Sequence, residues 1–113
     1  MAQMIEVGRE FLRINSQKNT IEYSKDGRNW ARRGGPFMKG ILNDICLFGQ
    51  CIYAATSKGI CYTKDNGVNW SYKTQTTAYG EFQSLTVSGT ILYAQTSKGL
   101  YYSKDGGTNW SKR

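Results

Sequence analysis

Short stretches of alternating hydrophobic and polar residues, separated by glycine, serine, asparagine and aspartate, run along the whole chain. The last third reads QSLTV (83–87), ILYAQT (91–96), LYYS (100–103) and WSKR (110–113), with turn-forming residues between these stretches. Such a pattern predicts short antiparallel strands joined by hairpins. No segment combines a 3.6-residue period with helix end signals, so we expect essentially no helix. The sequence therefore predicts an all-β chain.

The strand pattern occurs three times. Trp30, Trp70 and Trp110 are 40 residues apart, and residues 43–73 align with residues 83–113 without a gap. Residues 3–7 align with 83–87 and residues 11–12 with 91–92, with one extra residue near 17–20. A repeat of about 40 residues and four strands is typical of a β-propeller blade. We expect a single domain, 1–113, with blades at 3–34, 41–75 and 81–113.

The first predicted strand of repeat two is apolar on both faces, since Ile45 and Leu47 alternate with Cys46 and Phe48. This favours a sheet packed between two neighbours. Propellers close with about four to eight blades, and three blades alone would leave apolar faces open to water. Because two-fold assemblies are the commonest oligomers, we expect a homodimer that forms one six-bladed ring. The alternative is that the chain is a fragment of a longer propeller.

The turn before each tryptophan is the most specific motif: SKDGRNW (24–30), TKDNGVNW (63–70) and SKDGGTNW (103–110). Its aspartate is suited to accept hydrogen bonds from the following N–H groups, and its glycine permits positive φ. The motif resembles the Asp-box, S/T-x-D-x-G-x-x-W, of the sialidase-like (BNR) propeller family. Repeats two and three match it in full, and repeat one is a residue short. The resemblance implies a structural role for Asp26, Trp30, Asp65, Trp70, Asp105 and Trp110, opposite the catalytic face of sialidases.

Composition limits the chemistry. The absence of histidine excludes His-dependent triads and His-liganded metal sites, and no apolar run is long enough to span a membrane. Cys46, Cys51 and Cys61 make an odd count without a CxxC motif, and we expect them to fill the core, with Cys46 and Cys51 able to pair if oxidised. With no visible secretory leader, these features favour a cytoplasmic protein.

The sialidase resemblance also raises the question of catalysis. Sialidases use an arginine triad, a tyrosine nucleophile with a glutamate partner, and an acidic acid/base group, and none of these maps residue by residue onto this chain. The remaining candidate acids are Glu6, Glu10, Glu22, Asp44 and Glu81. We expect the first three to lie on a solvated face, and we predict no enzyme activity, no cofactor and no metal.

The chain has 15 Lys and Arg against 8 Asp and Glu, a formal charge of +7. This balance favours an anionic partner, or serves solubility alone. In a propeller, the turns between strands two and three share one face with the blade connections. That face collects the predicted ligand-binding residues: Arg32, Arg33, Lys39, Lys58, Tyr72, Lys73, Tyr79 and Lys98.

Two functions fit this face. The first is binding of a small ligand, either a glycan or an anionic phosphorylated compound such as a nucleotide. The alternative is a protein-interaction or inhibitor factor of phage type that blocks or scaffolds an acidic protein. Nucleic acid is a weaker candidate, because the charge permits it but no recognised nucleic-acid module is present.

Overall fold

The computed structural model describes residues 4–7, 10–15, 17–34, 41–49, 51–65, 67, 69–74 and 79–113. Within these ranges the chain forms three four-stranded antiparallel sheets, and in each sheet the strands lie in chain order. The elements are β1 (Met4–Val7), β2 (Glu10–Asn15), β3 (Thr20–Ser24) and β4 (Ala31–Gly34) in sheet one; β5 (Leu42–Phe48), β6 (Cys51–Thr56), β7 (Gly59–Thr63) and β8 (Ser71–Thr74) in sheet two; β9 (Phe82–Ser88), β10 (Ile91–Thr96), β11 (Gly99–Ser103) and β12 (Ser111–Lys112) in sheet three.

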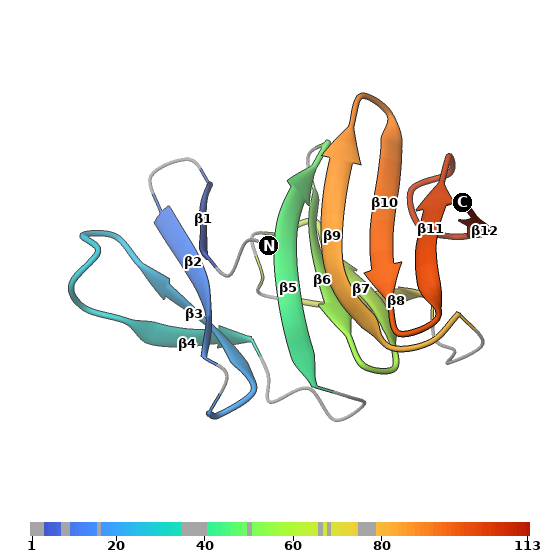
Figure 1. The fold of residues 1–113 in the computed structure, drawn as a ribbon. Helices are drawn as coiled ribbons and strands as arrows, with labels where there is room; N and C mark the ends of the chain where they lie inside the picture. The colour runs from blue at the N-terminus through green and yellow to red at the C-terminus, as the bar shows by residue number, and fades with distance from the viewer. Residues whose placement is uncertain are drawn as a thin grey trace.

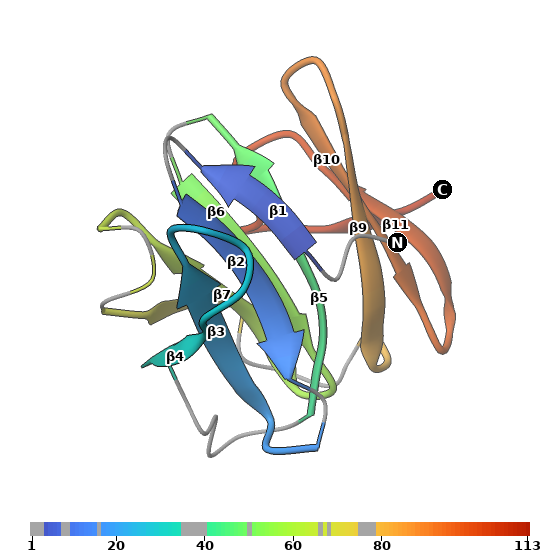
Figure 2. The same ribbon diagram turned by 90° about the vertical axis from the view of Figure 1, so that its left-hand side faces the viewer.

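The three sheets stand side by side, with sheet two in the middle (Figure 1). Figure 2 looks onto sheet one, with the strands of sheet two behind it. Strand β5 contacts both β1 and β9, so the first strands of the sheets are neighbours. The all-β class and the four-stranded blades expected from the sequence are confirmed. None of the described segments is a helix that is long and apolar enough to cross a membrane.

Sheet two is buried on both faces because successive apolar residues along its strands point to opposite sides of the sheet. We call the side of each sheet toward the next sheet in the chain its front face, and the opposite side its back face. The front face of sheet two packs on sheet three, and its back face packs on sheet one. The front face carries Cys46, Tyr53, Ala55 and Ile60, and the back face carries Ile45, Ile52, Ala54 and Cys61.

Strand register corrects the alignment of repeat one. Phe11 pairs with Ser24, whereas in sheet three it is Leu92 that pairs with Ser103. Phe11 is therefore the counterpart of Leu92 and not of Ile91. The turn between β2 and β3 has four residues, against two in the other sheets, so repeat one has two extra residues there. Sequence alignment misplaced them because neighbouring apolar residues match equally well in either register.

Sheets two and three are also joined by hydrogen bonds between β5 and β9. The Asn43 side chain donates to the carbonyl of Phe82 at 2.8 Å. The Asp44 carboxylate accepts from the backbone N–H of Leu85 at 2.8 Å and of Ile45 at 2.9 Å. Asp44 is 0% exposed, so this candidate acid is a buried link between blades.

Candidate functional site

The three aspartate turns share one hydrogen-bond arrangement, which we describe for the turn between β7 and β8. The Thr63 hydroxyl donates to Asp65 at 2.6 Å and accepts from the N–H of Gly67 at 3.1 Å. The Asp65 carboxylate also accepts from the backbone and side-chain nitrogens of Asn69, both at 2.8 Å. Equivalent bonds hold Asp105 and Asp26. Because each carboxylate is occupied by its own turn, the arrangement supports the structural role expected for these residues.

These bonds favour the ionised carboxylates. The Thr63 hydroxyl, followed by the Asn69 N–H, lowers the pKa of Asp65 to about 2. The N–H of Asn109, followed by the Ser103 hydroxyl, lowers the pKa of Asp105 to about 2. In the shorter first turn, the N–H groups of Asn29 and Arg28 lower the pKa of Asp26 further below its usual value.

The tryptophans differ between the turns. The Trp70 indole N–H donates to the carbonyl of Gly67 at 2.8 Å, and that of Trp110 to the carbonyl of Gly107 at 3.0 Å. Trp110 also donates to Thr74 of sheet two at 3.0 Å, so its ring helps to join two blades. Trp30 instead lies under the guanidinium of Arg13, 4.0 Å from the ring centre.

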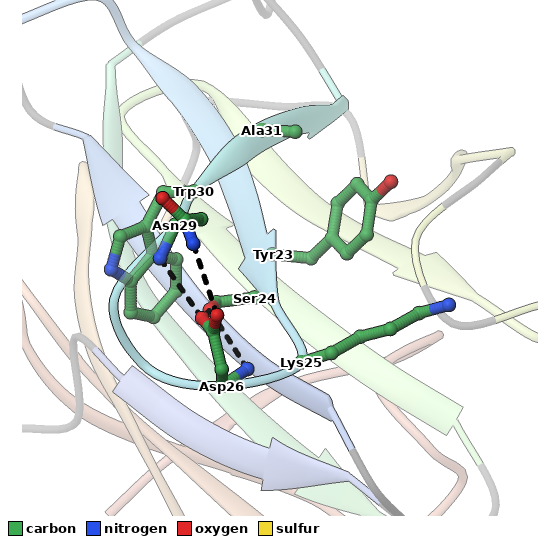
Figure 3. A pocket seen from close by; sticks show the side chains of 7 residues that line it. All are labelled: Tyr23, Ser24, Lys25, Asp26, Asn29, Trp30 and Ala31. Atoms are coloured by element: carbon green, nitrogen blue, oxygen red, sulfur yellow. Dashed lines mark hydrogen bonds between the residues drawn. The ribbon is translucent and has the colours of Figure 1, made fainter.

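A hollow of about 340 Å³ lies at the first aspartate turn. Figure 3 shows its lining, in which Lys25 and Tyr23 extend to one side of the turn and Trp30 lies on the other. Asp26 faces Asn29 across the turn and is hydrogen-bonded to it. The volume is at the lower end for small-molecule sites. Sequence analysis did not predict this hollow, because it placed binding on the opposite face.

On the face predicted to bind ligand, backbone hydrogen bonds tie two of the hairpin turns to the chain that enters their blades. The N–H of Ser57 donates to the carbonyl of Ile41 at 2.9 Å, and the N–H of Ser97 to that of Glu81 at 3.0 Å. The turns between strands two and three therefore touch the entries to their own blades. Gly80 fits here because a Cβ on it would stand 2.7 Å from the Ser97 hydroxyl and 2.9 Å from the Lys98 nitrogen.

Exposed lysines gather on this face, and we call Lys18, Lys58, Lys98 and Lys112 the basic rim. The first three occupy the equivalent turns of the three sheets, and all four are exposed. Lys112 was missed by sequence analysis, yet its side chain lies over Gly99, beside the turn that carries Lys98. Glu81 is also exposed on this face. Arg32 is exposed on β4, and the predicted site residue Lys39 lies outside the described residues.

Two of the predicted binding cations are instead packed at the seams between blades. Arg33 forms an ion pair with Glu10 at 2.9 Å, stacks 3.9 Å from the ring centre of Tyr23, and lies against Gly67 of the next blade. Lys73, at the equivalent place in sheet two, lies 4.8 Å from the ring centre of Tyr62. A bulge near the end of β4 and of β8 places these side chains there.

The two predicted aromatic binding residues are half-buried. Tyr72 packs against the core between sheets one and two, and burial, with the neighbouring Cys61, raises its pKa. Tyr79 packs edge-on against Tyr101, with ring centres 5.2 Å apart. Each ring thus fills a seam between blades, and neither is presented as an open stacking platform.

Of the remaining acids and thiols, most are held in ion pairs or buried. Glu22 pairs with Arg13 at 2.9 Å, so Glu10 and Glu22 form ion pairs where we had expected a solvated face. Cys46 and Cys61 are buried, and burial raises their pKa to about 12 and about 11. No group of three or more potential metal ligands is found in the described ranges.

Comparisons with known proteins agree with this architecture. The solved structure "YCF48 bound to D1 peptide" superposes with a TM-score of 0.74 at 19% identity, covering 97% of this chain and 39% of that one. The computationally designed Ika4 protein gives 0.64 at 7% identity, covering 88% and 62%. The chain thus spans less than two thirds of either protein, and these likenesses concern the fold. No curated protein matches the sequence. The family model for the DUF6242 beta propeller domain matches residues 3–113, and the chain belongs to that family.

Proposed function

We propose that this propeller domain is a non-enzymatic protein-interaction module whose basic rim binds an acidic segment of a partner protein. The observation that carries the proposal is the row of exposed lysines on equivalent turns of all three sheets. A similar propeller has been solved with a peptide bound, which supports a peptide-like partner. An extended acidic segment suits separate cations on neighbouring turns, because each lysine can meet a different carboxylate.

The engagement of the acids supports a non-enzymatic role. The three turn aspartates are occupied by their own loops, Glu10 and Glu22 are paired with arginines, and Asp44 is buried. Of the acids in the described ranges, two remain outside these contacts: Glu6 on β1 and Glu81 just before β9, both exposed. General acid–base hydrolysis of glycosides needs two carboxyl groups that flank one bond.

The rim is tested by fluorescence anisotropy with a labelled oligoglutamate peptide at low and high salt. The triple variant Lys58→Ala/Lys98→Ala/Lys112→Ala is expected to bind about tenfold more weakly or worse. The matched control, Lys25→Ala/Lys64→Ala/Lys104→Ala, removes the same charge from the aspartate turns and should bind like the wild type. Equal losses in both variants, or no binding by the wild type, would refute the proposal.

A small ligand is the second candidate, and the hollow beside Trp30 favours it. An aromatic ring with nearby amide and ammonium groups is suited to a sugar or an anionic metabolite. Thermal-shift screens against glycans and nucleotides, repeated with Trp30→Ala, test this candidate. A shift that survives the substitution would place the ligand elsewhere.

We also propose that the aspartate turns are Asp-boxes of the sialidase-like type, and that two chains complete one six-bladed ring. The front face of sheet three and the back face of sheet one have no neighbouring sheet among the described residues. Both carry exposed apolar side chains, with Leu100 37% and Met4 57% exposed. Ring closure by a second copy would cover both faces and present the basic rim twice.

A further inference from the structure

The seam between sheets two and three contains a tyrosine that reaches from one blade to the next. The Tyr53 hydroxyl donates to the carbonyl of Gly106, in the aspartate turn of sheet three, at 2.7 Å. The edge of its ring lies against Gly107, where an added Cβ would stand 3.5 Å from Cε2. This contact lies in the core that holds the two sheets together.

Both halves of this contact recur at the two uncovered faces of the chain. Tyr93 is the counterpart of Tyr53, because each pairs with the equivalent tyrosine on the next strand. Gly27 takes the place of both Gly106 and Gly107 in the shorter first turn: like Gly106 it follows the aspartate with φ 75°, and like Gly107 its N–H donates to the hydroxyl that begins the turn. Gly27 is exposed, and nothing lies within 4 Å of the place of a Cβ on it.

The Tyr93 hydroxyl can donate a hydrogen bond. Arg113 donates to its oxygen at 2.9 Å and lies 5.2 Å from its ring centre. A phenol both donates and accepts, so this bond leaves the Tyr93 proton available. Within the part of the chain that the structure describes, Tyr93 has no acceptor for that proton.

Other residues on the two uncovered faces also differ from their counterparts on the buried faces of sheet two. The front face of sheet three has Gln95 and Leu100 where the buried front face of sheet two has Ala55 and Ile60. The back face of sheet one has Arg13 and Glu22 where the buried back face of sheet two has Ala54 and Cys61. Three of these four apolar seam positions thus have a polar counterpart on an open face, and Leu100 stays apolar, which fits a seam that forms between separately folded chains.

We propose that the front face of sheet three docks on the back face of sheet one of a second copy, with the Tyr93 hydroxyl donating to the Gly27 carbonyl. The proposal rests on the ring closure proposed above and names the contact that makes it. The second copy is the favoured occupant because one chain carries both the donor and the acceptor of a contact that it already uses internally. In a two-fold ring the contact occurs twice.

The test is the mass in solution, measured by light scattering over a range of concentrations. Wild type should reach twice the 12.8 kDa of one chain. Tyr93→Phe removes only the hydroxyl and should raise the dissociation constant about tenfold or more, since two hydrogen bonds are lost per dimer. Tyr102→Phe, on the same face, is the matched control and should change the dissociation constant by less than about twofold.

A second pair of variants keeps the test independent of the hydroxyl. Leu100 and Val87 are both 37% exposed, but only Leu100 lies on the open front face. Leu100→Glu should give a monomer, whereas Val87→Glu should stay dimeric, with both folds checked by circular dichroism. A dimer unaffected by Tyr93→Phe and Leu100→Glu would overturn this contact and leave ring closure standing. A wild-type monomer at every concentration would overturn ring closure itself, whatever the result of the peptide assay.

Discussion

Replacing Asp44 with alanine is the sharpest test of how the blades are held together. Asp44 lies on β5 with its carboxylate 0% exposed, and it accepts from the N–H groups of Ile45 and Leu85 at 2.9 and 2.8 Å. The bond to Leu85 crosses from sheet two to sheet three. Asp44→Ala removes both bonds and leaves two buried N–H groups without this acceptor.

The magnitude follows from the strength of hydrogen bonds to charged groups, about 1.5–3 kcal/mol each. Two bonds give about 3–6 kcal/mol, and the variant recovers part of this because it no longer buries a charge. We therefore expect the free energy of unfolding to fall by about 3 kcal/mol. At roughly 4 °C per kcal/mol for a domain of this size, the melting temperature should drop by roughly 12 °C.

Urea unfolding followed by tryptophan fluorescence measures the loss, and calorimetry measures the shift in melting temperature. Asp44→Asn keeps one acceptor oxygen and should lose less than the alanine variant. Glu81→Ala removes an exposed acid near the entry of the next blade and should change stability by less than about 0.5 kcal/mol. If Asp44→Ala costs less than about 1 kcal/mol, the carboxylate does not hold the seam and the reasoning fails.

Two further predictions concern titration and thiol reactivity. Asp65 and Asp105 have pKa values of about 2 in the folded chain, below the ordinary value near 4, so their contribution to stability is full above about pH 4 and is lost as pH falls toward 2. Melting temperatures across this range should fall less steeply for Asp65→Asn than for wild type, and parallel curves would contradict the assignment. Cys46 and Cys61 should resist maleimide at pH 8 in the native protein and react in urea, since both are buried with pKa values of about 12 and about 11. Mass spectrometry counts the adducts, and rapid native labelling of either residue would show that its seam opens.

Much of the fold was predictable because its signals are local. The alternation of Ile45 and Cys46 indicated a strand buried on both faces, and the two side chains lie in different seams. The aspartate turns were predictable because donor and acceptor lie within a few residues. The register of repeat one was not, since Phe11 and Leu12 are both apolar and only the pairing of Phe11 with Ser24 distinguishes the two alignments.

The candidate site was less predictable because side-chain direction depends on distant partners. The sequence placed Arg33 on the predicted binding face, but a bulge brings its side chain to Glu10, 23 residues away. Asp44 has no acidic counterpart in the other repeats, so nothing in the repeat pattern indicated its bond to Leu85. Lys112 joins the rim by lying across Gly99, a contact that sequence spacing does not encode.

The unequal burial of the three sheets bears on whether their order in the gene matters. If the stack is open, a circular permutant that begins with sheet two and ends with sheet one would expose the apolar back face of sheet two, with Ile45 and Ile52, to solvent. In a circle of two chains the same permutant rebuilds every seam, because a circle has no first unit. Permutation would then move only the break in the polypeptide, and the permuted protein should remain as soluble as the original.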